Sequence, residues 1–230
     1  KRSIIEGILA LPPGASTSQK LAAILNGAGP AIQKLFQLFG EDVKSEQVAD
    51  VMRELKANIK AFPTEQAVEI IERDLGGPID EIFSEFRMKP LAAASVGQVY
   101  AAVIRESNEE VIVKVLRPGL RDKARREIAL LKELAPSPGM KKIVGRLEES
   151  LLEELDLRLE ADNMRAGEVY FRPQKGIAPV YTTDLPTTKD VLVMDRAYDN
   201  TINKFGGDDL DLKREALGEL LQLWFDEALF

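Results

Sequence analysis

The first part of the chain has the apolar periodicity of helices. Within residues 45–60, apolar side chains recur at i, i+3, i+4, i+7 and i+11, which puts them on one face of an amphipathic helix: Val48, Val51, Met52, Leu55 and Ile59. A second helix is expected after Pro63, with Thr64 as its cap, and it should end at Gly76-Gly77-Pro78 because a left-handed glycine and a proline stop a helix. A break at residues 26–30 precedes a short helix predicted over 31–39.

From Met88 onward the pattern changes to that of strands. Strand-favouring residues accumulate at Val96, Val99, Tyr100, Val103 and Ile104. The turn-forming run Glu106-Ser107-Asn108 separates them from a β-branched stretch over 111–116, which ends at Pro118-Gly119. Two such stretches around a short turn predict an antiparallel hairpin, and residues 191–194 predict one more buried strand.

Helical periodicity returns in the second half of the chain. Over residues 143–159, leucines repeat in i+4 steps at Leu147, Leu151, Leu155 and Leu159. The last segment, 212–230, puts apolar side chains on one helical face: Leu217, Leu220, Leu221, Trp224, Phe225, Ala228 and Leu229. No glycine, asparagine or proline stands at its end to stop it, so we expect the natural chain to continue beyond Phe230.

Composition narrows the possible chemistry. Hydrophobic residues make up 45% and charged residues 30%, which is ordinary for a globular protein. The net charge of −7 argues against a nucleic-acid-binding protein. The sequence contains no Cys and no His, which excludes disulfides, Cys-ligated metals and imidazole chemistry within this chain. Because no apolar run has membrane-spanning length, we expect a soluble or peripheral membrane protein, with the compartment left open.

A small-residue loop and a lysine within a strand are the first candidates for chemistry. The run AAASVG at residues 92–97 lies between two strand-like stretches, and Lys114 follows in the middle of the next strand. In kinase-like folds such a loop lets backbone amides approach the phosphates of ATP, which the lysine neutralises. A lysine in an apolar strand needs a carboxylate, a phosphate or water as its partner. The alternative is an edge strand whose lysine extends to solvent beside an ordinary turn.

A helical segment rich in carboxylates is the second candidate. Glu154, Asp156 and Glu160 lie downstream of the lysine strand, where a kinase-like N-lobe places the helix whose Glu orients that lysine. In one continuous helix Asp156 and Glu160 share a face, whereas Glu154 lies about 200° from Asp156, so the three cannot all serve one ligand. The alternative is a solvent-exposed acidic face.

The order of these motifs resembles the UbiB-type (AarF/ADCK) family of atypical kinases over about residues 29–230. GPAIQKLFQ at 29–37 is similar to the family's KxGQ segment, and KPLAAASVGQVY at 89–100 to its Ala-rich nucleotide loop. VIVKVLRPG at 111–119 is similar to the lysine strand, ELDLRLEADN at 154–163 to the ExD motif, and KDVLVMD at 189–195 to the strand before the hinge. Two positions depart from the pattern, Phe36 in place of the Gly of KxGQ and Asp195 in place of Glu.

The resemblance implies roles for the matching residues. Lys114 would hold the α and β phosphates of ATP or ADP, and Glu160 would orient Lys114. Lys34 and Gln37 would reach into the space where a protein kinase binds peptide, and Lys34 would pair with Glu154 or Asp156. The nucleotide would also be covered by the loop and the hinge strand: Ala92, Ala93, Ala94, Ser95, Val96, Gly97, Gln98, Met194 and Asp195. Mg²⁺ is expected to need a catalytic loop and a DFG-type aspartate that this sequence does not contain.

The resemblance also implies an architecture and a function. We expect an α+β fold with a helical extension at 1–87, a kinase-like N-lobe with a five-stranded antiparallel sheet and a helix at 88–197, and the start of a helical C-lobe at 198–230. In the family the KxGQ insertion blocks ordinary protein phosphorylation and leaves ATP binding and ATPase activity, linked to isoprenoid quinone (coenzyme Q) biosynthesis or lipid homeostasis. Two alternatives stay open: a pseudokinase-like scaffold without turnover, and a helical adaptor with a fortuitous hairpin.

The partners implied are a nucleotide, proteins of quinone biosynthesis and anionic membrane lipids. Lipid head groups would meet a basic cluster formed by Arg117, Arg121, Lys123, Arg125 and Arg126. The alternative is a solvated helix start, with Glu127 as a local partner for these cations.

Overall fold

The computed structural model describes residues 10–15, 19, 29–32, 34, 61–171, 180–197, 209–214 and 217–218. The chain divides into two units, residues 1–196 and 197–230. In the second unit, the described residues 210–214 and 217–218 are helical, and the rest of the helix predicted over 212–230 lies outside the described residues. The helix predicted over 45–60 lies outside the described residues.

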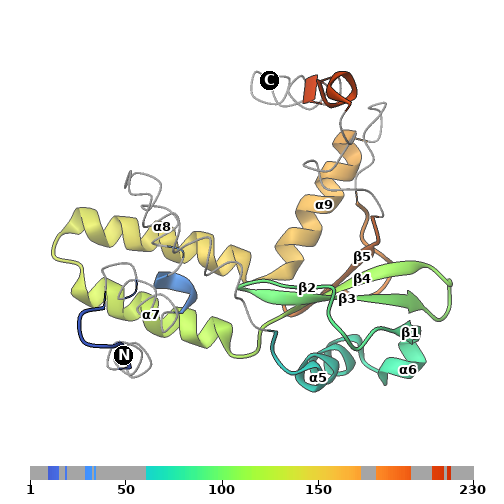
Figure 1. Ribbon diagram of the computed structural model, residues 1–230, viewed down its shortest axis with the longest axis horizontal. Helices are drawn as coiled ribbons and strands as arrows, with labels where there is room; N and C mark the ends of the chain where they lie inside the picture. Colours follow the sequence, from blue (N-terminus) through green and yellow to red (C-terminus); the bar gives the residue numbers. More distant parts are fainter. Residues whose placement is uncertain are drawn as a thin grey trace. The chain divides into compact units, whose positions relative to one another are not determined.

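Helices and strands alternate irregularly along the first unit, as expected for an α+β fold (Figure 1). No helix in the described ranges is long and apolar enough to cross a bilayer. The elements are α5 (Thr64–Leu75), α6 (Ile79–Ile82), β1 (Phe83–Phe86), β2 (Ala92–Ala93), β3 (Gly97–Ile104), β4 (Glu110–Leu116), α7 (Leu120–Leu134), α8 (Pro138–Glu154), α9 (Leu157–Phe171) and β5 (Val191–Asp195).

The strands form one five-stranded sheet in which every pairing is antiparallel. Its order is β1-β3-β4-β5, and β2 pairs with β3. The predicted hairpin is β3 and β4, whose turn includes Asn108 at a φ of 60°. The sheet begins with β1, which precedes Met88, the first residue of the predicted N-lobe. The fold class predicted from the sequence is confirmed.

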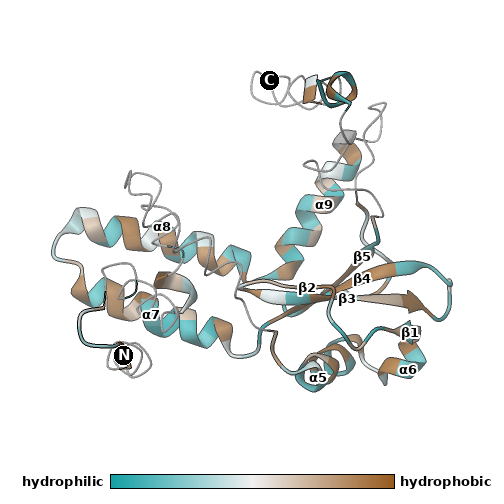
Figure 2. Ribbon diagram, viewed as in Figure 1, coloured by the Kyte–Doolittle hydropathy of each residue, from teal (hydrophilic) through white to brown (hydrophobic). Residues whose placement is uncertain are grey.

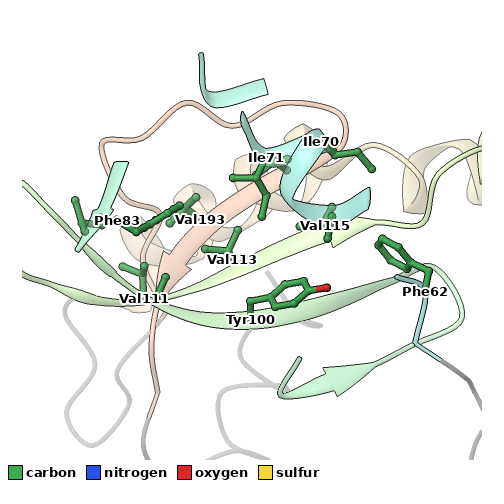
Figure 3. Packing of buried hydrophobic residues seen from close by; sticks show 13 residues of the cluster. Phe62, Ile70, Ile71, Phe83, Tyr100, Val111, Val113, Val115 and Val193 are labelled. Atoms are coloured by element: carbon green, nitrogen blue, oxygen red, sulfur yellow. The ribbon is translucent and has the colours of Figure 1, made fainter. Parts of the chain in front are cut away.

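A hydrophobic core lies between α5 and one face of the sheet. Figure 3 shows Ile70 and Ile71 of α5 facing strand side chains that include Tyr100, Val113 and Val193. Figure 2 shows the corresponding concentration of hydrophobic residues along β3, β4 and β5. Because side chains alternate along a strand, the opposite face of the sheet remains for other contacts.

The start of α5 differs from the prediction, whereas its end agrees. Thr64 does not cap the helix; Pro63 is the N-cap residue without a side-chain bond, and the Thr64 hydroxyl donates to the Met88 carbonyl instead. Proline tolerates this position because its fixed φ suits the beginning of a helix. Gly76 ends the helix with a φ of 84°, and its backbone N–H donates to Glu72 O.

The helix predicted over 143–159 is in fact two helices. α8 ends at Glu154, and α9 begins at Leu157 after the interruption at Leu155. The i+4 repeat of leucines therefore stops at Leu155, and Leu159 is 41% exposed. Asp156 starts the new helix, because its carboxylate accepts a hydrogen bond from the backbone N–H of Arg158 at 3.2 Å.

Candidate functional site

Lys114 and Glu160 form the central ion pair of the candidate site. Lys114 lies in β4, where its neighbours Val113 and Val115 are buried on the α5 face of the sheet. Its side chain is therefore on the other face, where Nζ lies 2.7 Å from Oε1 and 2.6 Å from Oε2 of Glu160 in α9. The two side chains are 22% and 39% exposed, so the pair is accessible from solvent.

Next to Lys114 this face of the sheet is apolar. Leu157 and Ala161 of α9 are buried against Leu116 and Leu192 of the sheet. Glu160 lies on the same side of α9 as these two residues, since positions three and four apart in a helix are neighbours. Apolar packing thus fixes α9 so that the Glu160 carboxylate meets the Lys114 ammonium and offsets its charge.

The Ala-rich loop runs close to the sheet beside this pair. Ala94 N–H donates to Gly97 O at 2.7 Å and closes the turn between β2 and β3. A Cβ atom on Gly97 would lie 2.3 Å from the carbonyl oxygen of Val115, so the strand can approach β4 this closely only with glycine. Val99 is paired directly with Lys114, which places the loop and the lysine on adjoining parts of one surface.

The side chain of Gln98 is buried in the core. It is 1% exposed, its Oε1 accepts from the backbone N–H of Phe62 at 3.2 Å, and its Nε2 donates to Phe62 O at 3.1 Å and to the Tyr100 hydroxyl. Only the backbone of Gln98 is left to face a nucleotide. This role was hidden in the sequence, because Phe62 and Gln98 meet only after α5 has folded onto the sheet.

The predicted hinge residues lie at the end of β5. Met194 packs at the edge of the apolar cluster around Leu192 and Leu116, on the Lys114 face of the sheet. Burial raises the pKa of the Asp195 carboxyl, and the negative charge of Glu109 raises it further. The two residues are thus placed along the strand next to β4, and their contact with a nucleotide stays a prediction.

The three candidate carboxylates bind three different cations. Glu154 accepts from Lys34 Nζ at 2.7 Å, Asp156 accepts from Arg158 Nη2 at 2.7 Å, and Glu160 pairs with Lys114. Bonds from the Arg158 side chain lower the pKa of Asp156, in spite of its partial burial. Lys34 therefore meets Glu154 and not Asp156, while Gln37 and Phe36 lie outside the described residues.

Glu127, which the sequence predicts only as a local partner for nearby cations, makes a long-range contact. Its carboxylate reaches from α7 to the segment that carries Lys34, where it accepts from the backbone N–H groups of Gly29 at 2.5 Å and Ala31 at 3.1 Å. Ala31 is fully buried against α7 and α8. Figure 1 shows this short helical segment between the two helices, held by Glu127 of α7 and Glu154 of α8.

Arg121 holds the interruption between α8 and α9. Its Nε donates to Leu155 O and its Nη2 to Lys189 O, both at 2.7 Å, and its Nη1 lies 2.7 Å from Asp190 Oδ1. The backbone N–H of Leu157 also donates to Lys189 O, at 3.2 Å. This member of the predicted basic cluster is therefore part of the frame that positions Glu154 and Glu160.

A metal site does not accompany these contacts in the described part of the chain. Among residues 61–171, 180–197 and the shorter described stretches, no three Asp or Glu side chains gather closely enough to hold a metal ion. The pair at Lys114 and the close approach at Gly97 fit a phosphate-bearing ligand, because one offers a cation and the other brings backbone near it.

Comparisons with known proteins agree on one family. Residues 54–228 match the ABC1 atypical kinase-like domain. A probable protein kinase UbiB of Marinobacter nauticus is 33% identical over 198 residues, covering 81% of this chain and 36% of the relative. A protein of the same name from Pseudomonas entomophila is 36% identical over 206 residues, covering 81% of this chain and 37% of the relative. The chain thus spans little more than a third of the length of these curated relatives.

A solved structure has a related fold. It is the complex of Rv3197 with erythromycin from Mycobacterium tuberculosis, with a TM-score of 0.53 and 25% sequence identity. The similarity covers 80% of this chain and 49% of that one.

Proposed function

The chain belongs to the ABC1 atypical kinase-like family, and we propose that it forms the nucleotide-binding part of a UbiB-type kinase or ATPase. The observation that carries the proposal is the pair of Lys114 with Glu160, on the sheet face beside the Ala-rich loop. A strand lysine oriented by a helix glutamate is the arrangement that kinase-like proteins use to bind the α and β phosphates of ATP.

In this proposal each element has one task. The Lys114 ammonium attracts the phosphates, and Glu160 keeps the ammonium in place when nucleotide is absent. The loop at residues 92–98 covers the phosphates with its backbone, which small side chains leave accessible. Met194 and Asp195 are the candidate contacts along the hinge strand. Mg²⁺ enters only as the ion that accompanies ATP and neutralises its phosphates.

The segment around Lys34 supports an atypical rather than an ordinary kinase activity. Its ion pair with Glu154 ties it to the end of α8, which is followed directly by the helix of Glu160. We propose that this segment occupies space that a peptide substrate would need. ATP hydrolysis, or transfer to a small acceptor, then suits the site better than protein phosphorylation.

The cellular role follows from the relatives. Proteins named UbiB cover most of this chain, so we propose a role in isoprenoid quinone biosynthesis, with proteins of that process as partners.

A thermal-shift titration with ATP and ADP, with and without Mg²⁺, tests the nucleotide site. A ligand that binds only the folded state raises the melting temperature in a saturable way. We expect such a shift for the 230-residue chain and its loss in Lys114→Ala. Lys141→Ala is the matched control, because Lys141 is exposed on α8 and lies outside the loop and the lysine strand.

Two outcomes would contradict parts of this proposal. An equal nucleotide shift in Lys114→Ala would contradict the assignment of Lys114. A complete lack of nucleotide binding by the wild-type chain would favour the pseudokinase-like scaffold.

A further inference from the structure

The short segment that leads into α5 contacts the chain on both sides of the Ala-rich loop. Ahead of the loop, the Thr64 hydroxyl donates to the carbonyl oxygen of Met88 at 3.0 Å. Behind the loop, the side chain of Gln98 binds the backbone of Phe62. We call residues 62–64 the brace, because this segment connects the two ends of the loop.

Gln98 holds the brace with a buried amide. Both of these bonds go to one residue, since Oε1 accepts from the backbone N–H of Phe62 at 3.2 Å and Nε2 donates to its carbonyl oxygen at 3.1 Å. Among the described residues, Gln98 is the one buried side chain that is polar or charged, apart from the Tyr100 hydroxyl to which it also donates. Because a buried amide is costly unless it is bonded, these contacts fix Gln98 against the brace.

A third connection reaches the middle of the loop. The Phe62 ring is buried, and the Arg117 guanidinium lies 5.3 Å from its centre. The backbone N–H of Arg117 in turn donates to Val96 O at 2.8 Å. Figure 3 shows Phe62 beside Tyr100 at one end of the hydrophobic core. The brace is therefore anchored in the core and connected to the loop at its start, in its middle and at its end.

The loop itself makes few contacts that would order it. Ala92, Ala94 and Ser95 are exposed, and the turn is closed by the bond from Ala94 N–H to Gly97 O. Segments with few buried contacts open easily. Ordering a flexible backbone costs free energy, so a loop that is ordered in advance binds its ligand more tightly.

We propose that Gln98 and the brace hold the Ala-rich loop in the conformation in which its backbone covers the phosphates of a nucleotide. Gln98 acts through the loop and not on the phosphates, so it is a positioning residue. The effect on affinity rests on the proposed function, whereas the ordering of the loop does not depend on it. The residues that precede α5 thereby become part of the nucleotide site, which the sequence motifs do not indicate.

Two variants remove the contacts on opposite sides of the loop. Gln98→Met keeps the length of the side chain but removes the amide, and Thr64→Val keeps the shape but removes the hydroxyl. Ile104→Ala is the control, because it removes a buried side chain at the opposite end of β3 from the loop. Amide exchange at Ala94, measured without nucleotide, reports the order of the loop. Isothermal titration calorimetry reports the affinity for ADP.

We expect both variants to raise the exchange rate at Ala94 and to weaken ADP binding about three- to tenfold, with both quantities unchanged in Ile104→Ala. A merely structural role would lower the melting temperature alone. If Gln98→Met does not fold, Thr64→Val decides the question.

Unchanged exchange at Ala94 in the folded variants would overturn the proposal. An equal increase in Ile104→Ala, or unchanged ADP affinity in spite of faster exchange, would overturn it as well. If the wild-type chain binds no nucleotide, the proposed function fails, while faster exchange in both variants still supports the brace as the element that orders the loop.

Discussion

Glu127 on α7 accepts a hydrogen bond from the backbone N–H of Gly29, across 98 residues of sequence. The same carboxylate accepts from Ala31, so it satisfies two amide groups at the start of the segment that carries Lys34. Negative charge is favourable at this end of a helix. The segment is thus attached by backbone at its beginning and by the Lys34 ammonium further along.

Removing the Glu127 carboxylate should loosen this attachment. We expect Glu127→Ala to raise the amide exchange rates of residues 29, 31, 32 and 34 and to lower the free energy of unfolding by about 1 kcal/mol, as loss of a helix cap does. Gly29→Ala should act in the same way, because its Cβ would lie 2.3 Å from Glu127 Oε1 and displace the carboxylate. The effects should not add in the double variant.

Glu148→Ala serves as the control for this comparison. Glu148 pairs with Lys132 of the same helical hairpin, so its removal breaks an ion pair between α7 and α8 and leaves the Glu127 contacts in place. Equal exchange rates at residues 29, 31, 32 and 34 in wild type and Glu127→Ala would show that Glu127 does not hold the segment.

The Lys114–Glu160 pair should contribute little to stability. Both side chains are partly exposed, so a double-mutant cycle with Lys114→Met and Glu160→Gln should give a coupling energy of about 0.5–1 kcal/mol in urea unfolding. Nucleotide affinity should nevertheless fall in both single variants. A coupling energy several times larger would identify the pair as a structural contact rather than a ligand site.

Asp156 should make the stability of the chain depend on acid pH. Its folded pKa is lowered, so its stabilising effect is complete above the unfolded pKa of about 4 and is lost as the pH falls through the lowered folded pKa. Asp156→Asn keeps a capping side chain but removes this titration, because Asn caps helices as well as Asp does. The free energy of unfolding measured from pH 7 to pH 2.5 should therefore fall less steeply in the variant.

Asp162→Asn is the comparison for that experiment. Asp162 is exposed on the same helix and bonds Arg165 at the surface. If both variants reduce the loss of unfolding free energy at acid pH equally, Asp156 makes no special contribution to that loss.

Gly97 should be intolerant of a side chain. The carbonyl oxygen at 2.3 Å from its virtual Cβ belongs to the backbone of Val115 and cannot rotate away, so Gly97→Ala should cost about 1–3 kcal/mol. Gly145→Ala in α8 should have the opposite effect and stabilise by about 0.5–1 kcal/mol, because no atom of the described residues lies within 4 Å of its Cβ position. Thermal unfolding of both variants measures the difference. A neutral Gly97→Ala would mean that β3 and β4 do not approach this closely.

Local sequence patterns were sufficient to predict most of the sheet and helix α5. The β-branched run of β4 and the Gly76 stop depend on neighbours in sequence, so each could be predicted from the residues alone. The ordered motifs also led to the correct family. The meeting of Lys114 with Glu160 followed from that resemblance, not from spacing.

Contacts that depend on distant segments were not predictable in the same way. The i+4 spacing of leucines continues through residues 155–159 and so predicts one continuous helix. The interruption between α8 and α9 is explained by the hydrogen bonds of Arg121 and Asp156, which the spacing does not reveal. Glu127 was interpreted as a neighbour of local cations because nothing in the sequence shows that Gly29 returns to it. The sequence predicts Gln98 as a loop residue, because its burial depends on the contact with Phe62.

Arg121 recognises two carbonyl oxygens of the main chain, those of Leu155 and Lys189. Every amino acid supplies a carbonyl, so mutations that accumulate at positions 155 and 189 during evolution leave these two bonds available. For these two bonds the requirement for a particular side chain rests on position 121, whereas the third contact also needs the carboxylate of Asp190. Even lysine would be a poor replacement there, because a single ammonium cannot reproduce the separate Nε, Nη1 and Nη2 contacts of the guanidinium.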